Sequence, residues 1–257
     1  MYLSKKTLDD LLRAAFEKIL DQGIRVKATK GSNTELAGVV LELQNPRARL
    51  SRTETKGTVF SCLGETLWYL AKTNRLDFIK YYLHDYSKFS DDGRTLYGAY
   101  GPRLFKLDGI DQIESVVRLL KKKRSTRQAV IQLFDAKDIL KNRKDIPCTC
   151  SIQLIIRREK LDMFTYMRSN DAYKGLPHDI FAFTFLQEIL ARVLGVGLGR
   201  YWHAAASLHL YDDDRPKVTH TSFADDAGTE KDPHYLDADG SAERGILTAI
   251  DSSRTSV

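Results

Sequence analysis

The sequence predicts an α+β domain with a mostly antiparallel or mixed sheet, and three observations carry that prediction. In several segments apolar residues recur at three- and four-residue steps, the spacing of a helix that packs on a core. Other segments are short, rich in β-branched and aromatic residues and typical of strands. Two of these, 151–157 and 161–168, are separated by a short polar turn and predict a hairpin. Helices and strands together favour the α+β class.

Four segments are predicted to be helical. The first has Ser4 or Thr7 as its capping residue and Gly23 as its stop. The last is the longest and leaves little polar surface, so we expect it to be the buried central helix. The predicted helices cover 8–20, 63–70, 110–120 and 179–194.

Five segments are predicted to be strands, and two others lack the pattern of either element. The arginine-rich segment 44–58 predicts a loop. From about 221 to 257 the composition shifts to Asp, Gly, Ser, Thr and Ala, which predicts a polar tail after a single domain at 1–220. The predicted strands cover 39–43, 129–134, 151–157, 161–168 and 201–211.

Composition narrows the class of protein. The 257 residues are 42% hydrophobic and 29% charged, which argues against a disordered or low-complexity chain. With 40 basic and 34 acidic residues the net charge is +6, a mild excess that fits a small phosphorylated ligand and gives no reason to expect direct nucleic-acid binding. No apolar run approaches the ~20 residues of a membrane span, the N-terminus has no signal-peptide pattern, and only three cysteines occur. We therefore expect a cytoplasmic protein without membrane association.

Cys148 is the first candidate for chemistry. It follows Pro147 at the entry to a predicted strand, where its sulfur can be exposed at a sheet edge. A nearby guanidinium would lower the pKa of the thiol and favour the nucleophilic thiolate. A lone cysteine is more often a small buried hydrophobe, so this residue needs further support.

That support comes from the motifs around it, which are Pro147-Cys148 with Gln153, Met167 to Asp171, Gly175-Leu176-Pro177 and Ser207 to Tyr211. Together they resemble the thymidylate synthase family. Upstream, the segment 64–68 is similar to the family's glutamate-containing helix, and 99–101 to its active-site tyrosine loop. From Cys148 through Tyr211 the chain can be laid on the family without a gap. The resemblance covers about 1–215 and implies a mixed sheet with surrounding helices and a homodimer formed through the sheet.

The resemblance implies a role for each matched residue and no metal. Cys148 would add to C6 of a pyrimidine nucleotide, so that C5 attacks the methylene group of 5,10-methylenetetrahydrofolate. Glu65 would organise water and proton transfer, and Tyr100 would assist proton removal at C5. Arg168 and Ser169 would bind the phosphate, with Arg127 reaching it from the neighbouring subunit, although Gln128 stands where the family has a second arginine. His209 and Tyr211 would bind the sugar hydroxyl, and Asp171 and Gly175 the folate. Lys30 is a candidate for a further phosphate cation, with Arg47, Arg49 or Arg52 as alternatives.

Asp179 stands where a thymidylate synthase carries asparagine. An asparagine amide fits uracil, whereas cytosine reverses the donor and the acceptor on that edge. An ionised Asp179 would accept the amino proton and stabilise N3 if that atom becomes protonated, so we expect a preference for cytosine. The alternative is that Asp179 is only the N-cap of the long helix.

Other departures resemble the deoxycytidylate and cytidylate hydroxymethylases. They include Thr149 after the cysteine and Ser207 two residues before His209. The resemblance implies that water, rather than a hydride from the folate, completes the reaction. His178 and Lys174 replace apolar folate-contacting positions, and 79–93 contains no tryptophan, which predicts a wetter pocket. The expected function is therefore hydroxymethylation at C5 of CMP or dCMP. The alternatives are methylation of dUMP and a non-catalytic nucleotide-binding relative.

Overall fold

The computed structural model describes residues 1–28, 30–51 and 58–221. The predicted tail lies outside these residues except for Thr221, as does 52–57 of the predicted loop. The single domain at 1–220 stays a prediction. No helix within the described ranges has the length and apolar character needed to cross a bilayer.

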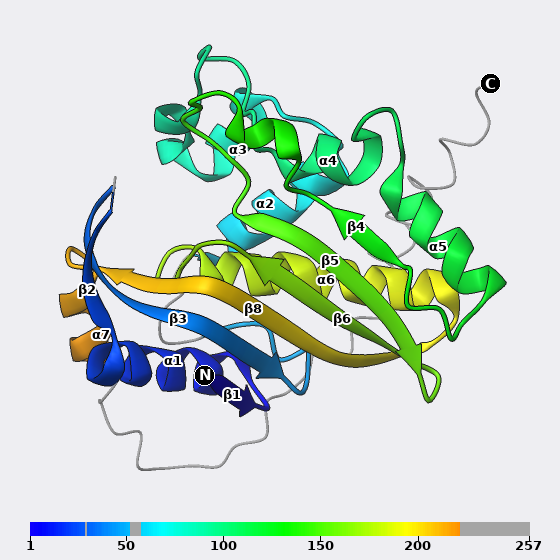
Figure 1. Cartoon of the computed structure of the whole chain (residues 1–257), viewed down its shortest axis with the longest axis horizontal. Helices are drawn as coiled ribbons and strands as arrows, with labels where there is room; N and C mark the ends of the chain where they lie inside the picture. The colour runs from blue at the N-terminus through cyan, green and yellow to red at the C-terminus, as the bar shows by residue number, and fades with distance from the viewer. Residues whose placement is uncertain (29, 52–57, 222–257) are drawn as a thin grey trace. The chain divides into compact units, whose positions relative to one another are not determined.

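A mixed eight-stranded sheet is the centre of the fold (Figure 1). β1 pairs parallel with β3, as β6 and β7 do with β8, and the other pairs are antiparallel. This confirms the predicted α+β class and the hairpin. The strands in sheet order are β1 (Tyr2–Lys5), β3 (Gly31–Leu43), β8 (Gly197–Tyr211), β6 (Lys160–Met167), β5 (Thr149–Arg157) and β4 (Val130–Gln132), with β2 (Ile24–Ala28) on β3 and β7 (Asn170–Asp171) on β8.

The four predicted helices form, and shorter ones join them. Thr7 is the cap of the first helix because its side chain accepts a hydrogen bond from the Asp10 N–H, whereas Ser4 lies in β1. The helices are α1 (Leu8–Gln22), α2 (Thr58–Leu70), α3 (Leu76–Tyr82), α4 (Tyr100–Lys106), α5 (Gln112–Lys122), α6 (Leu176–Leu194) and α7 (Arg215–Thr221), with 3₁₀ helices η1 (His84–Phe89) and η2 (Ala136–Ile139).

α6 begins three residues earlier than predicted. Pro177 occupies its first turn, where a missing N–H costs no helical hydrogen bond, and Gly195 ends it with a φ of 64°. Asp179 therefore lies inside the helix, where its N–H donates to the Gly175 carbonyl. The N-cap interpretation of Asp179 is wrong.

The two faces of the sheet differ in burial. β6 and β8 turn Met163, Met167, Tyr201 and His203 into the core, where both strands contact α6. The alternate residues, represented by Phe164 and its stacked neighbour Trp202, are half-buried on the other face, with ring centroids 4.3 Å apart. The core face therefore carries buried side chains up to the strand ends at which the predicted site residues lie.

Candidate functional site

The β5–β6 hairpin brings Cys148 and Arg168 together. Cys148 immediately precedes β5 and Arg168 immediately follows β6, and the Arg168 N–H donates to the Cys148 carbonyl at 2.9 Å. The Arg168 guanidinium also donates to the carbonyls of Pro147 (2.9 Å) and Ile146 (3.0 Å). Its Nη2 atom lies 3.8 Å from the Cys148 sulfur. Cys148 and Arg168, 20 residues apart in sequence, are thus in direct contact.

Burial dominates the ionisation of Cys148. It raises the pKa of the thiol above its ordinary value, and the nearby charge of Arg168 only partly opposes this. Asp179 raises the pKa further, while Lys30 lowers it. The guanidinium of Arg168 lowers the thiol pKa as expected, but burial outweighs it, so the expected net lowering is wrong. The neutral thiol is the resting form, and nucleophilic attack requires that its proton leave when substrate is bound.

Glu65, on α2, is buried, and its carboxylate has three polar partners. Its carboxylate accepts from the hydroxyls of Tyr69 (2.7 Å) and Tyr86 (3.1 Å), and it pairs with His178 Nδ1 at 2.9 Å. Burial alone would raise the pKa of Glu65, but these partners outweigh it and lower the pKa. Burial also disfavours a charged His178, yet hydrogen bonds to Cys62 and Glu65 raise its pKa to about 10. The two residues form a buried ion pair at neutral pH.

Tyr100 begins α4 and contacts the residue after the cysteine. Its hydroxyl oxygen accepts from the backbone N–H of Thr149 (3.0 Å) and from the Thr149 hydroxyl (2.9 Å). Burial raises the pKa of Tyr100 well above its usual range, and the charges of Asp179 and Cys148 add to the effect. The phenol therefore stays protonated, and its hydrogen is available as a donor.

Asp179 is 8% exposed in the first turn of α6. Its Oδ2 atom accepts a hydrogen bond from the Asn170 amide at 2.7 Å. Burial, with the Glu65 carboxylate as a second cause, raises the pKa of Asp179 to about 8. The expectation that Asp179 is ionised is therefore wrong at neutral pH.

The candidate sugar and folate residues lie around the short strand β7. Asp171 pairs with His209 of β8, and the His209 and Tyr211 rings meet edge to face with centroids 5.0 Å apart. Burial lowers the pKa of His209, so its ring is neutral. Asp171 accepts two backbone N–H groups of the following turn. A Cβ at Gly175 would lie only 3.1 Å from the Asn170 amide nitrogen, so this close approach favours glycine.

The candidate phosphate-binding residues divide into those near Cys148 and those elsewhere. Arg168 contacts Cys148, Ser169 is half-buried beside it, and Lys30 is close enough to influence the Cys148 pKa. Arg47 and Arg49 both pair with Glu188 of α6, and Arg52 lies outside the described residues. Lys30 is thus favoured over those alternatives.

Arg127 is the one predicted site residue that these contacts do not join to the Cys148 region. It lines a separate cavity of about 460 Å³ together with Lys123, Ser125, Thr126, Gln128 and Arg157. The cavity lies beside the β4–β5 edge, since Arg127 precedes β4 and Arg157 ends β5.

Comparison with known proteins decides the family. The family model described as "Thymidylate synthase" matches residues 12–224. The chain belongs to the thymidylate synthase family. It is 32% identical over 195 residues to a deoxyuridylate hydroxymethyltransferase of Delftia phage PhiW-14, a match that covers 70% of this chain and 54% of that protein. Enzymes of the same name from Bacillus phage SP01 (32% over 194 residues, 70% and 51%) and Pseudomonas phage M6 (34% over 168 residues, 64% and 48%) are similar too. The chain spans about half the length of these relatives.

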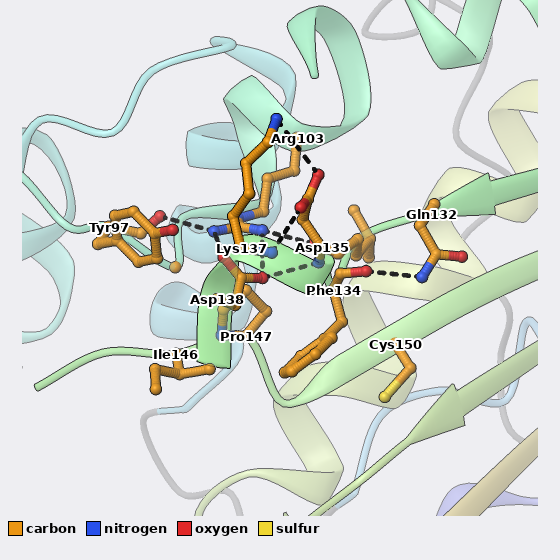
Figure 2. A network of polar contacts seen from close by, with 12 residues as sticks. Tyr97, Arg103, Gln132, Phe134, Asp135, Lys137, Asp138, Ile146, Pro147 and Cys150 are labelled. Atoms are coloured by element: carbon orange, nitrogen blue, oxygen red, sulfur yellow. Dashed lines mark hydrogen bonds and ion pairs between the residues drawn. The ribbon is translucent and has the colours of Figure 1, made fainter. Parts of the chain in front are cut away.

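Sequence reasoning missed a buried network of hydrogen bonds next to the candidate site of this thymidylate synthase-family protein (Figure 2). Arg103, three residues after Tyr100 on α4, forms a bidentate pair with Asp138 at 2.8 Å for each bond. Arg103 also donates to the carbonyls of Leu133 and Tyr97, and Asp138 accepts from the Asp135 N–H. The network ties the Tyr100 helix to the segment that leads to Cys148. Arg103 lies two residues after the matched loop 99–101, but its partner is 35 residues away and no local pattern marks it.

Replacing Arg103 with methionine is expected to destabilise the fold. The substitution leaves Asp138, 1% exposed, as an uncompensated buried carboxylate, which costs about 3–5 kcal/mol. Urea unfolding followed by circular dichroism measures the change. Arg118→Met, which breaks an exposed pair with Glu114, is the matched control and should leave the midpoint unchanged. Equal midpoints for the two variants would contradict this assignment.

Within the described ranges no group of three or more His, Cys, Asp or Glu side chains is arranged to hold a metal ion.

Proposed function

We propose that this protein is a pyrimidine nucleotide C5 hydroxymethyltransferase that acts on CMP or dCMP. The one-carbon donor would be 5,10-methylenetetrahydrofolate, with Asp171 and Gly175 at its site, and water would complete the reaction. The observation that carries the proposal is Asp179, a buried carboxyl close enough to Cys148 for its charge to raise the thiol pKa. Membership of the thymidylate synthase family supports Cys148 as the nucleophile.

The protonated state of Asp179 fits the amino edge of cytosine. Because the Asn170 amide donates to Oδ2, the carboxyl proton belongs on Oδ1. A carboxylic acid of this kind donates to N3 and accepts from the N4 amino group of an unprotonated cytosine. As the Cys148 sulfur bonds to C6, the Asp179 proton passes to N3, where it neutralises the electron density that addition places on the ring. Asp179 therefore supplies the proton that N3 takes up.

A second candidate is hydroxymethylation of dUMP. It is favoured by the three phage relatives, whose names carry deoxyuridylate. Those names support water as the final nucleophile and speak against a methylating enzyme, but they do not support cytosine.

One experiment separates the candidates. The protein is incubated with CMP, dCMP or dUMP and methylenetetrahydrofolate labelled in the transferred carbon. The expected products are a 5-hydroxymethylcytosine nucleotide and tetrahydrofolate. A 5-hydroxymethyluracil product would overturn the base assignment, and methylated uracil with dihydrofolate would overturn the reaction type.

The Glu65–His178 pair is expected to serve the water step. Water that adds to the exocyclic methylene must lose a proton, and an ionised Glu65 can accept it. Replacing His178 with phenylalanine removes the cation that keeps the pKa of Glu65 low, so kcat should fall by roughly 10²-fold. The acid limb of the kcat profile should move to higher pH. An unchanged kcat and pH profile in His178→Phe would contradict this role.

We further propose that a second copy of this chain covers the face of the sheet opposite the core face. Phe164 and Trp202 stack there, half-buried, and Tyr166 is 45% exposed. Dimerisation would let Arg127 of one copy reach the phosphate of the other, which accounts for its separation from Cys148 in one chain.

Replacing Trp202 with lysine is expected to give a monomer, because a charge at the centre of an apolar interface cannot be solvated. Sedimentation equilibrium measures the mass of the wild type and the variant. Tyr81→Lys, at a 70% exposed position on α3, is the control and should remain dimeric. A monomeric wild type would contradict the proposed dimer.

A further inference from the structure

We infer that the buried side chains of Tyr201, His203 and Asn170 form a hydrogen-bonded chain that positions Asp179 and decides which of its oxygens carries the proton. The inference rests on the proposed function, since it concerns how Asp179 would recognise a base. It assigns a positioning role to three residues that do not themselves react.

The hydrogen-bonded chain is continuous and buried. The Tyr201 hydroxyl lies 2.9 Å from His203 Nδ1, and His203 Nε2 lies 2.9 Å from Asn170 Oδ1. Asn170 Nδ2 then donates to Asp179 Oδ2 at 2.7 Å. Tyr201 and His203 are 0% exposed and Asn170 is 3% exposed. These polar groups satisfy one another without bulk water.

The donors and acceptors of such a chain can point in only two consistent directions. Burial lowers the pKa of His203 to about 3, so the ring is neutral and has one donor and one acceptor. In the first direction Tyr201 donates to Nδ1, Nε2–H donates to Asn170, and Asn170 donates to Asp179. In the reverse direction Asp179 would have to donate from Oδ2, which would leave Oδ1 as a pure acceptor toward the pocket. The first direction alone gives a neutral Asp179 a donor to face the base.

The surroundings hold the chain in place. Tyr201 and His203 lie on the core face of β8, and Asn170 is the first residue of β7, paired to β8. Gly175 packs close to the Asn170 amide, since a Cβ there would lie 3.1 Å from its nitrogen. The other titratable groups whose charges act on Asp179, or on which its charge acts, are Glu65 and Tyr69 of α2, His178 of α6, Asp171 of β7, Tyr86 of η1, Tyr100 of α4 and Cys148.

A buried polar chain is costly unless it is fully paired, so apolar residues would serve packing alone more simply. This distinguishes a positioning role from a structural one. Tyr201→Phe removes one hydroxyl and leaves the rest of the chain intact. His203→Leu removes the central link. Thr184→Val, at a buried position on α6 where the hydroxyl donates to the Ile180 carbonyl, is the matched control for core substitutions.

The test combines an unliganded readout with kinetics. Nitrogen-15 NMR of the histidine rings in the free wild-type protein should show His203 protonated at Nε2 only, and Tyr201→Phe should show a mixture of tautomers. The ratio of kcat/KM for dCMP to that for dUMP should fall at least tenfold in His203→Leu, with a smaller fall in Tyr201→Phe and none in Thr184→Val. The pH profile of kcat/KM for dCMP should shift in both chain variants.

The inference is overturned by an Nδ1–H tautomer of His203 in the wild type, or by chain variants that fold and keep the wild-type ratio and pH profile. Failure of the proposed function looks different, because a wild-type protein that turns over neither cytidine nucleotide would still report its tautomer by NMR.

Discussion

Replacing Cys148 with serine is expected to abolish turnover of the nucleotide, with a loss on the order of 10⁴-fold or more in kcat, as for other nucleophile deletions. The reason is chemical: only a sulfur nucleophile can add readily to C6, and without that adduct C5 cannot attack the folate methylene. Release of tritium from C5 of labelled dCMP measures the step directly, because the C5 hydrogen leaves only after the adduct has formed.

Cys150→Ser is the matched control for that experiment. Cys150 lies two residues further along the same segment and is likewise partly buried, but its sulfur contacts backbone groups of the site, among them the Cys148 carbonyl at 4.0 Å. This variant should release tritium at nearly the wild-type rate. Unchanged release in Cys148→Ser would rule out covalent catalysis and leave a nucleotide-binding protein.

Replacing Asp179 with asparagine should reverse the preference for the base. The amide keeps the shape of the carboxyl group but offers uracil an acceptor for N3–H and a donor for O4. Each mismatched pair is worth roughly 1–3 kcal/mol, so the ratio of kcat/KM for dCMP to that for dUMP should fall on the order of 10²-fold or more. Steady-state assays with both nucleotides measure it.

The pH dependence of kcat/KM is a second test of the role of Asp179. The raised pKa of Asp179, about 8, keeps the carboxyl proton available below that pH and removes it above. In the wild type kcat/KM for dCMP should therefore fall as the pH rises through this value, and the fall should vanish in Asp179→Asn. Asp162→Asn, at another carboxyl whose pKa burial raises, is the control and should change neither result. A wild-type base preference that survives in Asp179→Asn would contradict the assignment.

Much of the fold and of the candidate site is visible in the sequence because both follow local patterns. The hairpin was predictable from two alternating segments and a turn, and it accounts for the meeting of Cys148 with Arg168. The strands β1, β2 and β7 were not predicted from the sequence, because their pairing is set by β3 and β8.

The remainder depends on burial and on distant partners, which no local pattern encodes. The thiol pKa of Cys148 was expected to be low from its arginine, but desolvation outweighs that charge. Asp179 was expected to be ionised and is protonated for the same reason. No local sequence pattern marks His203 as a candidate, because its partners Tyr201 and Asn170 belong to no motif that indicates such a contact.

The most direct measurement is a crystal structure of the Cys148→Ser protein with dCMP bound. We predict that Asp179 lies within hydrogen-bond distance of both N3 and the N4 amino group, with the serine oxygen beneath C6. A carboxyl turned away from the base, or a ring whose C6 lies beyond reach of residue 148, would contradict the account.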